Sequence, residues 1–522
     1  MPGTPNAASV LIVGGGSAGA VLATRLSEDP TRSVLLLEAG PAYAPEAYPG
    51  ALLNADVVAD PGHDWGYTSH ATGSTPEIPM PRGKVLGGSS AVNATVAMRP
   101  RPADFAKWAE RGVDGWSFDE VLPAFKRMEN TPTGDDAYHG RTGPLPVRQR
   151  SDEELTPSLL GFLKASVAHG FKRVDDFNGV EQHGTGAVPV DAVDGVRQNT
   201  GLVYLTAKVR SRPNLTILGG VTVDRVLFDG ERAVGVSEAN GTVYRADEVI
   251  VSGGSYGSAA ILLRSGVGPA ADLRSLGIEV VADLPVGQRL HDHPIFPNVY
   301  ALVPKYLQMT PAVGSLVWTA SSEAIGDELD LHIAATHLLD PALSPTGGLI
   351  VVAIALVQPE SRGTLRLASR DPDQAPLIDN NYLGTDRDAR RLLEGVTLSR
   401  AICRNNAFAP FTAAEMLPGD AITDEALPDV IASNLASYAH PTSTVPMGGP
   451  GDPWAVVDAV GAVKGLAGLR VVDASILPEI PSCATNLTTI MVAERVYERV
   501  YASAAEVTES QGHSGAALPP GR

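Results

Sequence analysis

The stretch that decides the fold lies at residues 9–38 and reads SVLIVGGGSAGAVLATRLSEDPTRSVLLLE. It predicts a buried strand over 9–13, a helix over 17–26 and a second buried strand over 34–38. A GxGxxG turn joins the first strand to the helix, and an acidic residue ends the second strand. This order is typical of a unit that binds a dinucleotide through its backbone.

Each glycine of the turn has a separate task in such a unit. Gly14 permits the tight bend, Gly16 lets the backbone approach a pyrophosphate, and Gly19 lets helix and strand pack closely. The helix that begins near Ser17 directs its free N–H groups and the positive end of its dipole at the phosphates. Glu38 accepts hydrogen bonds from ribose hydroxyls and repels a 2′-phosphate, so NADP is disfavoured. The motif alone leaves FAD and NAD open.

Composition excludes several classes of partner. The 522 residues include 40 Lys and Arg against 59 Asp and Glu, a net charge of −19, so we expect no nucleic-acid partner. The longest apolar run, 349–357, is too short to span a bilayer, and residues 1–9 lack the features of a signal peptide. Two cysteines, Cys403 and Cys483, provide no disulfide framework, which favours a cytoplasmic location.

The rest of the chain divides into two kinds of pattern. A second strand–glycine–helix unit at 248–265 indicates that the nucleotide domain is completed discontinuously. Residues 294–382 alternate short apolar strands with turns and predict an antiparallel sheet, and 385–404 predicts an amphipathic helix. Other predicted segments are helical spacing over 103–130, strands at 214–218 and 221–228, and a disordered tail at 503–522.

Further motifs follow in order along the chain. They read GKVLGGSSAVN (83–93), SGVGP (265–269), DHP (292–294), HPTSTVPMG (440–448), VVDAS (471–475) and PSCATN (481–486). Together with LEAG at 37–40, this series resembles the glucose–methanol–choline (GMC) family of flavin oxidoreductases. The resemblance implies FAD as the cofactor, with the glycine-rich turn holding its ADP half.

Pattern and resemblance together predict an α/β fold with two domains. A discontinuous Rossmann-like FAD-binding domain is expected over 1–100, 186–293 and 431–502. A substrate-binding (cap) domain with a largely antiparallel sheet covered by helices is expected over 101–185 and 294–430.

The resemblance also assigns the cofactor contacts. Asn93 is expected near the pyrimidine edge and N5 of the flavin, the Val223 backbone at the adenine, and Asp473 at the ribityl and pyrimidine parts. Val92 stands where some family members carry a histidine bonded to the flavin, so FAD is expected to bind non-covalently. The full set of expected cofactor positions is Gly14, Gly16, Ser17, Ala18, Gly19, Glu38, Ala39, Val85, Gly88, Ser89, Asn93, Ala94, Val223, Asp473, Ala474 and Asn486.

Alcohol oxidation by a flavin needs a base for the hydroxyl proton and a donor for the developing alkoxide. Histidine suits the first task because its ordinary pKa lies near working pH. His440 matches the catalytic histidine of the family, and Asn486 matches its partner position. An amide cannot act as a base, so Asn486 is expected to orient the substrate oxygen. Ala439 stands where several members place an aromatic side chain, which predicts a roomier approach to His440.

His291 and His293 form an HxH pair, a pattern that can ligate a metal. No third ligand of convincing spacing follows it, and the resemblance accounts for this loop, so we predict no metal site.

These observations favour an FAD-dependent alcohol dehydrogenase or oxidase. A lyase or decarboxylase on the same scaffold, like a hydroxynitrile lyase, stays the alternative, and a flavin-binding protein without turnover is a weaker one. The electron acceptor is expected to be oxygen, a quinone or another carrier. The predicted cap domain has many apolar residues and few cationic anchors, and aromatic content is only 5%. We therefore expect a neutral or apolar primary alcohol, with negligible turnover of choline.

Overall fold

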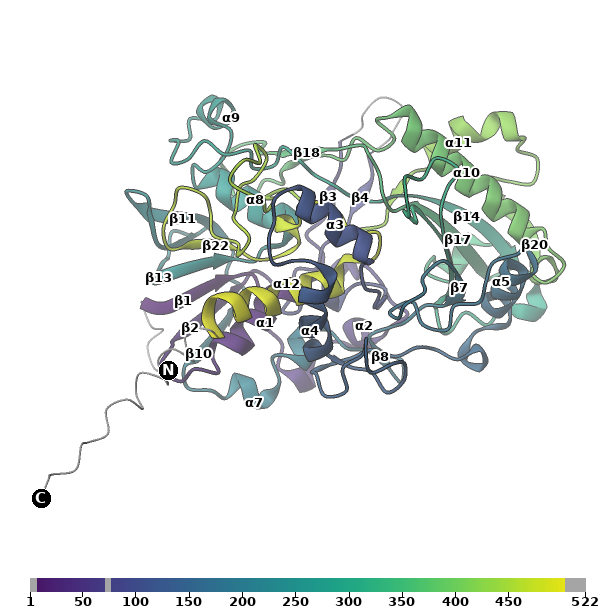
Figure 1. Cartoon of the computed structure of the whole chain (residues 1–522), viewed down its shortest axis with the longest axis horizontal. Coiled ribbons are helices and arrows are strands. Elements are labelled where there is room, and N and C mark those ends of the chain that lie inside the picture. Colours follow the sequence, from purple (N-terminus) through teal and green to yellow (C-terminus); the bar gives the residue numbers. More distant parts are fainter. Residues whose placement is uncertain (1–6, 71–76, 503–522) are drawn as a thin grey trace, which may run out of the picture.

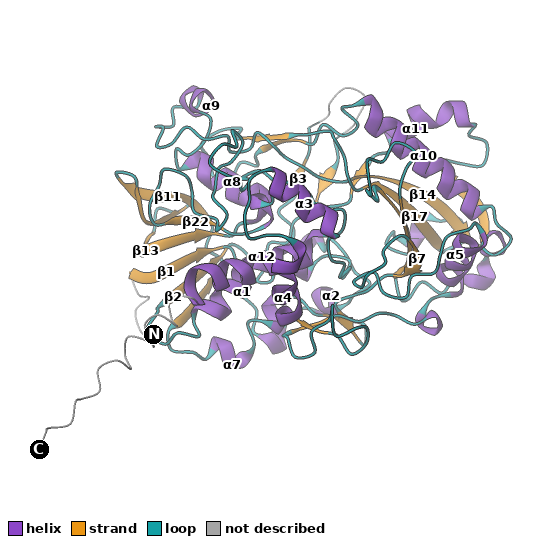
Figure 2. Ribbon diagram, in the orientation of Figure 1, coloured by secondary structure: helices purple, strands orange, loops and turns teal. Residues whose placement is uncertain are grey.

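Two large β-sheets lie toward opposite ends of the long axis of the molecule, with helices around and between them (Figures 1 and 2). The computed structural model describes residues 7–70 and 77–502. The predicted tail at 503–522 lies outside these residues. Within the described ranges each large sheet has seven strands.

The first sheet is built around the strand that precedes the glycine-rich turn. That strand, β1, pairs in parallel with β2 and β13, while β10 extends the sheet beyond β2, and β22 pairs with β13. A hairpin of β11 and β12 continues it antiparallel. β2 is buried throughout, as expected for a parallel strand covered on both faces. The strands are β10 (Leu215–Gly219), β2 (Val34–Glu38), β1 (Ala7–Val13), β13 (Val243–Val251), β12 (Arg232–Glu238), β11 (Val223–Asp229) and β22 (Leu469–Val471).

Three helices pack at the first sheet and border the glycine-rich turn. They are α1 (Ser17–Leu26), α8 (Gly254–Arg264), which follows β13, and α12 (Thr485–Tyr497), which lies alongside α1 (Figure 1). The Arg25 guanidinium of α1 lies 2.9 Å from the fully buried Glu494 carboxylate of α12. The last helix of the described chain is therefore tied to the first one.

The second sheet is antiparallel throughout. Its order is β20-β14-β17-β16-β15-β7, with β21 also paired to β14. Every residue of the central strand β17 is buried, because α10 (Asp386–Cys403) and α5 (Pro157–Ala168) pack against this sheet. The strands are β20 (Thr412–Leu417), β14 (Pro294–Leu302), β17 (Leu349–Leu356), β16 (Leu331–Thr336), β15 (Val313–Thr319), β7 (Gly184–Ala187) and β21 (Ala436–Ser437).

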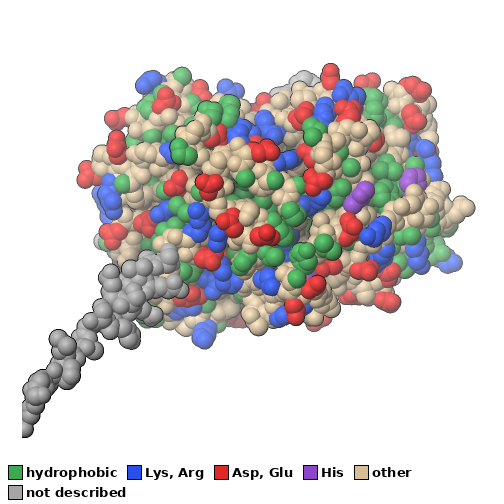
Figure 3. Space-filling model, viewed as in Figure 1, with side chains coloured by type: hydrophobic (Ala, Val, Ile, Leu, Met, Phe, Trp, Pro, Cys, Tyr) green, Lys and Arg blue, Asp and Glu red, His purple; other side chains and the backbone are tan. Residues whose placement is uncertain are grey.

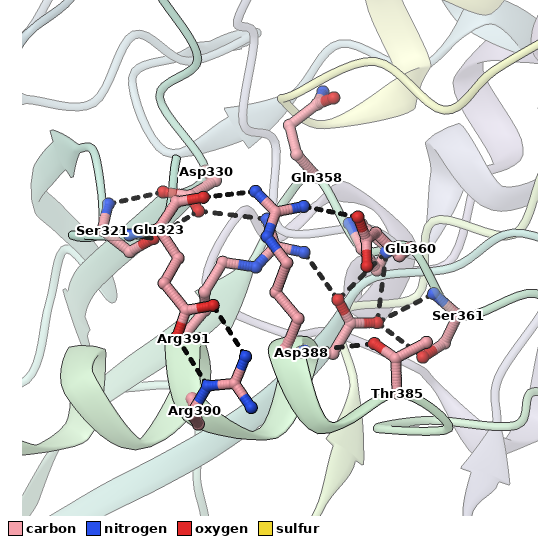
Figure 4. Close-up of polar contacts among 12 residues, drawn as sticks. Ser321, Glu323, Asp330, Gln358, Glu360, Ser361, Thr385, Asp388, Arg390 and Arg391 are labelled. Atoms are coloured by element: carbon pink, nitrogen blue, oxygen red, sulfur yellow. Dashed lines mark hydrogen bonds and ion pairs between the residues drawn. The ribbon is translucent and has the colours of Figure 1, made fainter. Parts of the chain in front are cut away.

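A buried ionic network fixes α10 to the second sheet (Figure 4). The fully buried Arg391 guanidinium lies 3.1 Å from Asp330 and 2.6 Å from Asp388. Asp330 also accepts hydrogen bonds from the backbone and hydroxyl of Ser321, and Asp388 accepts from those of Ser361. Each buried carboxylate therefore has a charged partner and additional hydrogen-bond donors, which a buried ion pair requires.

The remaining helices and strands lie outside the two large sheets. The helices are α2 (Gly50–Leu53), α3 (Pro102–Glu110), α4 (Phe118–Met128), α6 (Thr200–Val203), α7 (Ala207–Arg210), α9 (Ala270–Ser275) and α11 (Leu427–Ser433). The strands are β3 (Tyr67–Thr68), β4 (Pro79–Met80), β5 (Glu129–Asn130), β6 (Leu145–Pro146), β8 (Ala192–Val193), β9 (Val196–Arg197), β18 (Thr364–Arg366) and β19 (Leu377–Asp379).

The predicted fold class, a Rossmann-like unit with a separate antiparallel sheet, is confirmed. Two edge strands fall across the predicted domain limits, because residues 186–187 and 436–437 belong to the second sheet. The division into domains itself stays a prediction. Within the described residues, no helix has the length and apolar character needed to cross a bilayer. On the face in Figure 3, acidic and basic side chains are interspersed.

Candidate active site

Two close backbone approaches shape the glycine-rich turn between β1 and α1. Gly14 has a φ of +96°, and a Cβ atom there would lie 2.4 Å from the Ser252 carbonyl oxygen just after β13. A Cβ atom on Gly19 would lie 1.9 Å from the Gly14 carbonyl oxygen. Glycine at both positions lets α1 pack tightly against β1, so the free N–H groups of its first turn face the space beyond the turn.

The second glycine motif folds onto the first. The Gly87 N–H donates to the Gly15 carbonyl oxygen at 2.8 Å. A Cβ atom on Gly88 would lie 2.7 Å from the Gly16 Cα. Bare backbone from both motifs therefore meets at this point, which leaves room for a ligand to approach main-chain donors.

Glu38 lies at the end of β2 with its carboxylate buried. It accepts hydrogen bonds from the Gly15 and Gly40 N–H groups, each at 2.8 Å. Burial raises the pKa of Glu38 to about 7, although these backbone donors oppose the shift. Each carboxylate oxygen keeps a second lone pair, so the side chain can still accept from ligand hydroxyls.

Asn199 is a polar residue of this region that the sequence did not reveal. Its side-chain amide is buried, and neither Oδ1 nor Nδ2 has a hydrogen-bond partner within the protein. It lies close to Gly87, and the adjacent Thr200 hydroxyl is 3.4 Å from the Gly16 carbonyl oxygen. Its only sequence signal is a position ahead of a short helix, which asparagine takes for capping reasons alone.

Asp473 connects three segments near the same turn. Its carboxylate accepts hydrogen bonds from the Gly254 N–H at 2.8 Å, from the Ser258 hydroxyl at 2.5 Å and from the backbone and hydroxyl of Ser475. The neighbouring Ala474 carbonyl oxygen accepts from the Ser443 N–H at 3.3 Å. The start of α8, the Asp473 segment and the loop that carries His440 are therefore joined.

The other predicted cofactor positions make contacts within the protein. The Val85 carbonyl accepts from the Gly88 N–H, Ser89 Oγ accepts from the Gly83 N–H, and Asn93 Oδ1 accepts from the Thr95 N–H. Ala18 is buried in α1, Ala39 follows β2, Ala94 packs on a small apolar cluster and Val223 begins β11. Their role toward a cofactor stays a prediction.

His440 is held from two directions. Its Nδ1 lies 3.0 Å from Nδ1 of His293, so one of these nitrogens donates to the other. Its backbone N–H donates to Asp292 at 2.8 Å, and Asp292 also accepts from the His293 N–H, the Tyr382 hydroxyl and the Ser437 hydroxyl. Burial, together with His293 and Arg82 nearby, holds the pKa of His440 well below its ordinary value.

The residue before His440 has an uncommon backbone conformation. Ala439 has a φ of +63°, in the left-handed region that is unfavourable for residues other than glycine. Its carbonyl oxygen accepts from the Arg82 guanidinium at 2.7 Å, and its N–H donates to the Ser437 hydroxyl at 2.8 Å. These bonds on both sides fix the peptide that carries His440, and strained backbone of this kind often occurs at functional sites.

A series of aromatic rings leads from His440 into the second sheet. The Tyr438 ring lies 4.7 Å from the His440 ring and 6.2 Å from His332 on β16, whose ring is 4.8 Å from Trp318 on β15. His332 is buried and its Nε2 has no hydrogen-bond partner within the protein. The surroundings of His440 therefore combine apolar ring surface with two polar atoms that have no partner within the protein, His332 Nε2 and His293 Nε2.

Asn486 lies in the first turn of α12 and reaches the glycine-rich turn. Its Oδ1 accepts from the Ser17 hydroxyl at 2.8 Å, across 469 positions of sequence. Its Nδ2 donates to Asp191 at 3.3 Å. The structure thus brings Asn486 to the glycine-rich turn, and its role at the cofactor stays a prediction. Asp191 is a neighbour that no motif indicated.

His291 belongs to the same loop as His293 but faces a different group. It is buried, and its Nδ1 lies 3.3 Å from the Ser443 hydroxyl. Among residues 7–70 and 77–502, no three histidine, cysteine or acidic side chains are grouped so that they could hold a metal ion.

Comparisons with known proteins give consistent results. Models of the GMC oxidoreductase family match residues 8–295 and 359–493. Oxygen-dependent choline dehydrogenase from Photobacterium profundum is 34% identical over 94% of this chain and 92% of that protein. The same enzyme from Pseudomonas aeruginosa is 37% identical over 94% of each chain. The crystal structure of pyridoxine 4-oxidase from Mesorbium loti has a TM-score of 0.87 at 31% identity, over 95% of this chain and 99% of that one.

The fold and its glycine-rich turn define a dinucleotide-binding protein. More particularly, the chain belongs to the GMC oxidoreductase family. It is an FAD-dependent oxidoreductase that acts on CH–OH donors, which confirms the predicted family, cofactor and enzyme class.

The residues around the turn fit FAD. The buried Asn199 amide has no partner within the protein, the Glu38 carboxylate has spare lone pairs, and bare backbone borders the meeting point of Gly16 and Gly88. A dinucleotide supplies hydroxyl and carbonyl groups for the first two and needs the close approach that the glycines allow.

Proposed function

We propose that this protein oxidises a primary alcohol to its aldehyde, with His440 as the base that accepts the hydroxyl proton. One observation carries the proposal: the His440 imidazole is partly buried and held through Nδ1 by His293, while Asp292 holds its backbone. FAD, when bound, supplies the acceptor for the hydride that leaves the alcohol carbon. The alcohol loses its hydroxyl proton to His440, so the products are an aldehyde and the reduced cofactor.

The protonation state of the two histidines supports this role. Burial lowers the pKa of His293 to about 3, and the pKa of His440 is likewise lowered, so both rings are neutral at pH 7. If the His440 Nδ1–H donates to His293, the lone pair on Nε2 of His440 is free to accept a proton from substrate. A base must be unprotonated before the reaction, and burial maintains this state.

Asn486 has the complementary task of donating to the same oxygen. Its Oδ1 already accepts from Ser17, and one N–H of Nδ2 is directed at Asp191. The second N–H is available for the alcohol oxygen, where negative charge develops as the proton leaves.

The proposed site would hold FAD without a covalent bond. Val92, at the position where a linking histidine stands in some family members, is buried and has no group that can form such a bond. The predicted contacts are the glycine-rich turn, Glu38, Asn93 and Asp473, to which we add Asn199.

The surroundings of His440 favour a neutral aromatic or apolar alcohol. Asp292 is the carboxylate nearest this histidine in the hydrogen-bond network, and it already accepts four hydrogen bonds. The Arg82 guanidinium bonded to Ala439 disfavours a second cation nearby. Tyr438 and His332 offer ring surface and one free polar group, which suits an aromatic alcohol.

Choline is the second candidate substrate, because the choline dehydrogenases named above are 34% and 37% identical to this chain. Aromatic rings such as Tyr438 can also bind a quaternary ammonium group. A panel that includes choline, a pyridine methanol and benzyl alcohol distinguishes the candidates. We expect kcat/KM for an aromatic alcohol to exceed that for choline, and the reverse order would overturn the preference.

Oxygen is the proposed electron acceptor, since two relatives are named as oxygen-dependent enzymes, with a quinone or another carrier as the alternative. The cytoplasmic location stays a proposal; it rests on the two cysteines, Cys403 and Cys483, which are free and buried. A lyase or decarboxylase on this scaffold stays an alternative, and it would leave the flavin oxidised when substrate is added without oxygen.

The decisive experiment is anaerobic reduction of the bound flavin, followed by its absorbance in a stopped-flow instrument. Bleaching by alcohol shows oxidation, whereas a flavin that stays yellow while product forms shows the lyase. We expect His440→Gln to slow bleaching by about 100-fold or more. His337→Gln is the matched control, because His337 is buried but bonded to Leu349 and Thr156 at the second sheet. An unchanged rate in His440→Gln would contradict the base assignment.

A further inference from the structure

The orientation of the Asn486 amide decides what this residue can do. An amide has one accepting and one donating end, and the two orientations differ by a half-turn. In the structure Oδ1 accepts from the Ser17 hydroxyl at 2.8 Å, and Nδ2 donates to Asp191 Oδ2 at 3.3 Å. Ser17 can either donate or accept, so it accommodates both orientations. Asp191 does not.

Asp191 is a buried carboxylate on a fixed backbone. Only 1% of its surface is exposed, and its Oδ1 has no hydrogen-bond partner within the protein. Its N–H donates to the Thr95 carbonyl oxygen and its own carbonyl accepts from the Gln198 N–H, each at 2.9 Å. An ionised carboxylate only accepts, so it attracts Nδ2 of Asn486 and repels Oδ1.

We propose that Asp191 is a positioning residue that locks the Asn486 amide with Nδ2 toward the carboxylate. In this orientation the remaining N–H of Asn486 donates to the oxygen of the alcohol. The inference deepens the proposed function and rests on it, because Asn486 must act at that oxygen. The reverse orientation would place an amide oxygen against a buried carboxylate and turn a lone pair toward the substrate.

The charged neighbour of Asp191 is Arg197 on β9. Its guanidinium donates to the carbonyl oxygens of Leu52, Ala91 and Asn93, so it is held near the carboxylate by the surrounding backbone. Burial raises the pKa of Asp191 to about 7, and Arg197 opposes the shift. A protonated Asp191 can donate as well as accept, so the lock on Asn486 is released as pH falls below this value.

The test is a double-mutant cycle in the holoenzyme with Asp191→Asn, Asn486→Ala and both together. The readouts are kcat/KM for benzyl alcohol against pH, and the Kd for FAD. Asparagine keeps the shape of Asp191 but presents a donor as readily as an acceptor. We expect Asp191→Asn to lower kcat/KM by about tenfold and to remove the acidic limb near pH 7, with an unchanged Kd for FAD. Asn486→Ala should lower kcat/KM by about 100-fold. The double variant should have the same kcat/KM as Asn486→Ala alone, because Asp191 acts only through Asn486.

The outcomes separate the role of Asn486 at the alcohol oxygen from the positioning role of Asp191. If Asn486→Ala leaves the rate intact, the proposed role of Asn486 fails. If Asn486→Ala slows the reaction while Asp191→Asn keeps the wild-type rate and pH profile, only the positioning role is overturned. A Kd for FAD that rises in step with the lost rate would also overturn it, because Asp191 would then act on the cofactor site. Asp330→Asn is the control for loss of a buried carboxylate, and we expect it to leave the pH profile unchanged.

Discussion

At the scale of single residues, Gly19 stands where the structure leaves no space for a Cβ atom. A Cβ atom at this position would lie 1.9 Å from the Gly14 carbonyl oxygen, far inside contact distance. The obstructing atom is backbone, so it cannot rotate away. Any side chain at this position would push α1 away from β1 and widen the turn that is predicted to hold the pyrophosphate.

We predict that Gly19→Ala strongly reduces the FAD content of the purified protein, measured as visible flavin absorbance per mole of chain. Gly50→Ala is the control, because a Cβ atom at Gly50 meets nothing within 4 Å and its φ lies outside the left-handed region. The control should retain wild-type flavin content. Equal flavin content in Gly19→Ala would show that the turn tolerates displacement of α1.

The buried Glu38 carboxyl gives a prediction about pH. Its pKa is about 7 in the folded chain against 4.5 for a free glutamate, so the folded FAD-free protein binds this proton more tightly than the unfolded chain. The free energy of unfolding therefore falls as pH rises through this window, by up to about 3 kcal/mol. The Glu38→Gln variant should lack this part of the decrease in the free energy of unfolding. Urea unfolding of the FAD-free proteins below and above this pH window measures the change in the free energy of unfolding. The same change with pH in the wild type and in Glu38→Gln would contradict the prediction.

The residues that the sequence revealed and those that it did not differ in how their partners are reached. Gly19 and Glu38 act on neighbours within one strand–turn–helix unit, so spacing alone predicts their tasks. Asn199 and Asp191 reach the site through contacts with segments far away in the chain. Nothing in their local sequence distinguishes them from a capping residue and a turn residue.

At the scale of elements, Arg391 joins α10 to the second sheet through buried ion pairs. Arg391 is fully buried and pairs with Asp330 and Asp388, which are themselves fully buried (Figure 4). The next residue toward the start of this helix, Arg390, is exposed and bonds to Glu323 at the surface. We therefore expect these neighbouring arginines to contribute very differently to the free energy of unfolding.

We predict that Arg391→Met lowers the free energy of unfolding by about 3–5 kcal/mol, because two buried carboxylates lose their charged partner. Arg390→Met should change it little, since that pair is exposed to solvent. Urea unfolding followed by circular dichroism compares the two. A small loss for Arg391→Met would show that Ser321 and Ser361 alone satisfy the carboxylates.

The elements that were predicted share a strong apolar pattern. β1, β2 and β17 are continuous apolar runs, and α10 has apolar residues at helical spacing, so their type follows from periodicity. β15 and β7 were not predicted. β15 contains Gly314 and Ser315 among its apolar residues, and β7 reads GTGA at 184–187, so neither has a strand-like alternation. β15 becomes a strand because it pairs with the open edge of β16, and β7 becomes one because it pairs with β15.

At the scale of the whole molecule, the predicted site joins groups from distant parts of the chain. The glycine-rich turn comes from the first strand and helix, Asn486 from the last helix, and His440 from the loop that Asp292 fixes between the two sheets. FAD bound at this junction would contact several of these segments at once. Bound cofactor should therefore stabilise the molecule as a unit.

We predict that removing FAD lowers the melting temperature and that adding it back restores the loss in proportion to the logarithm of its concentration. Free FAD at 100 times its Kd contributes about 2.7 kcal/mol. Thermal unfolding followed by circular dichroism measures this effect. His440→Gln should keep the full FAD-dependent rise, because its role is in catalysis. If His440→Gln loses both the FAD-dependent rise in melting temperature and the rate of flavin reduction, His440 supports the cofactor site.

The pairing of α1 with α12 has a consequence for synthesis in the cell. Ser17 and Arg25 meet Asn486 and Glu494 across 469 positions, so a nascent chain cannot make these contacts until α12 has been synthesised. Until then the apolar flank of α1 has no permanent cover. We expect flavin uptake to follow the synthesis of α12, and ribosome-bound intermediates that lack α12 to need chaperones around α1.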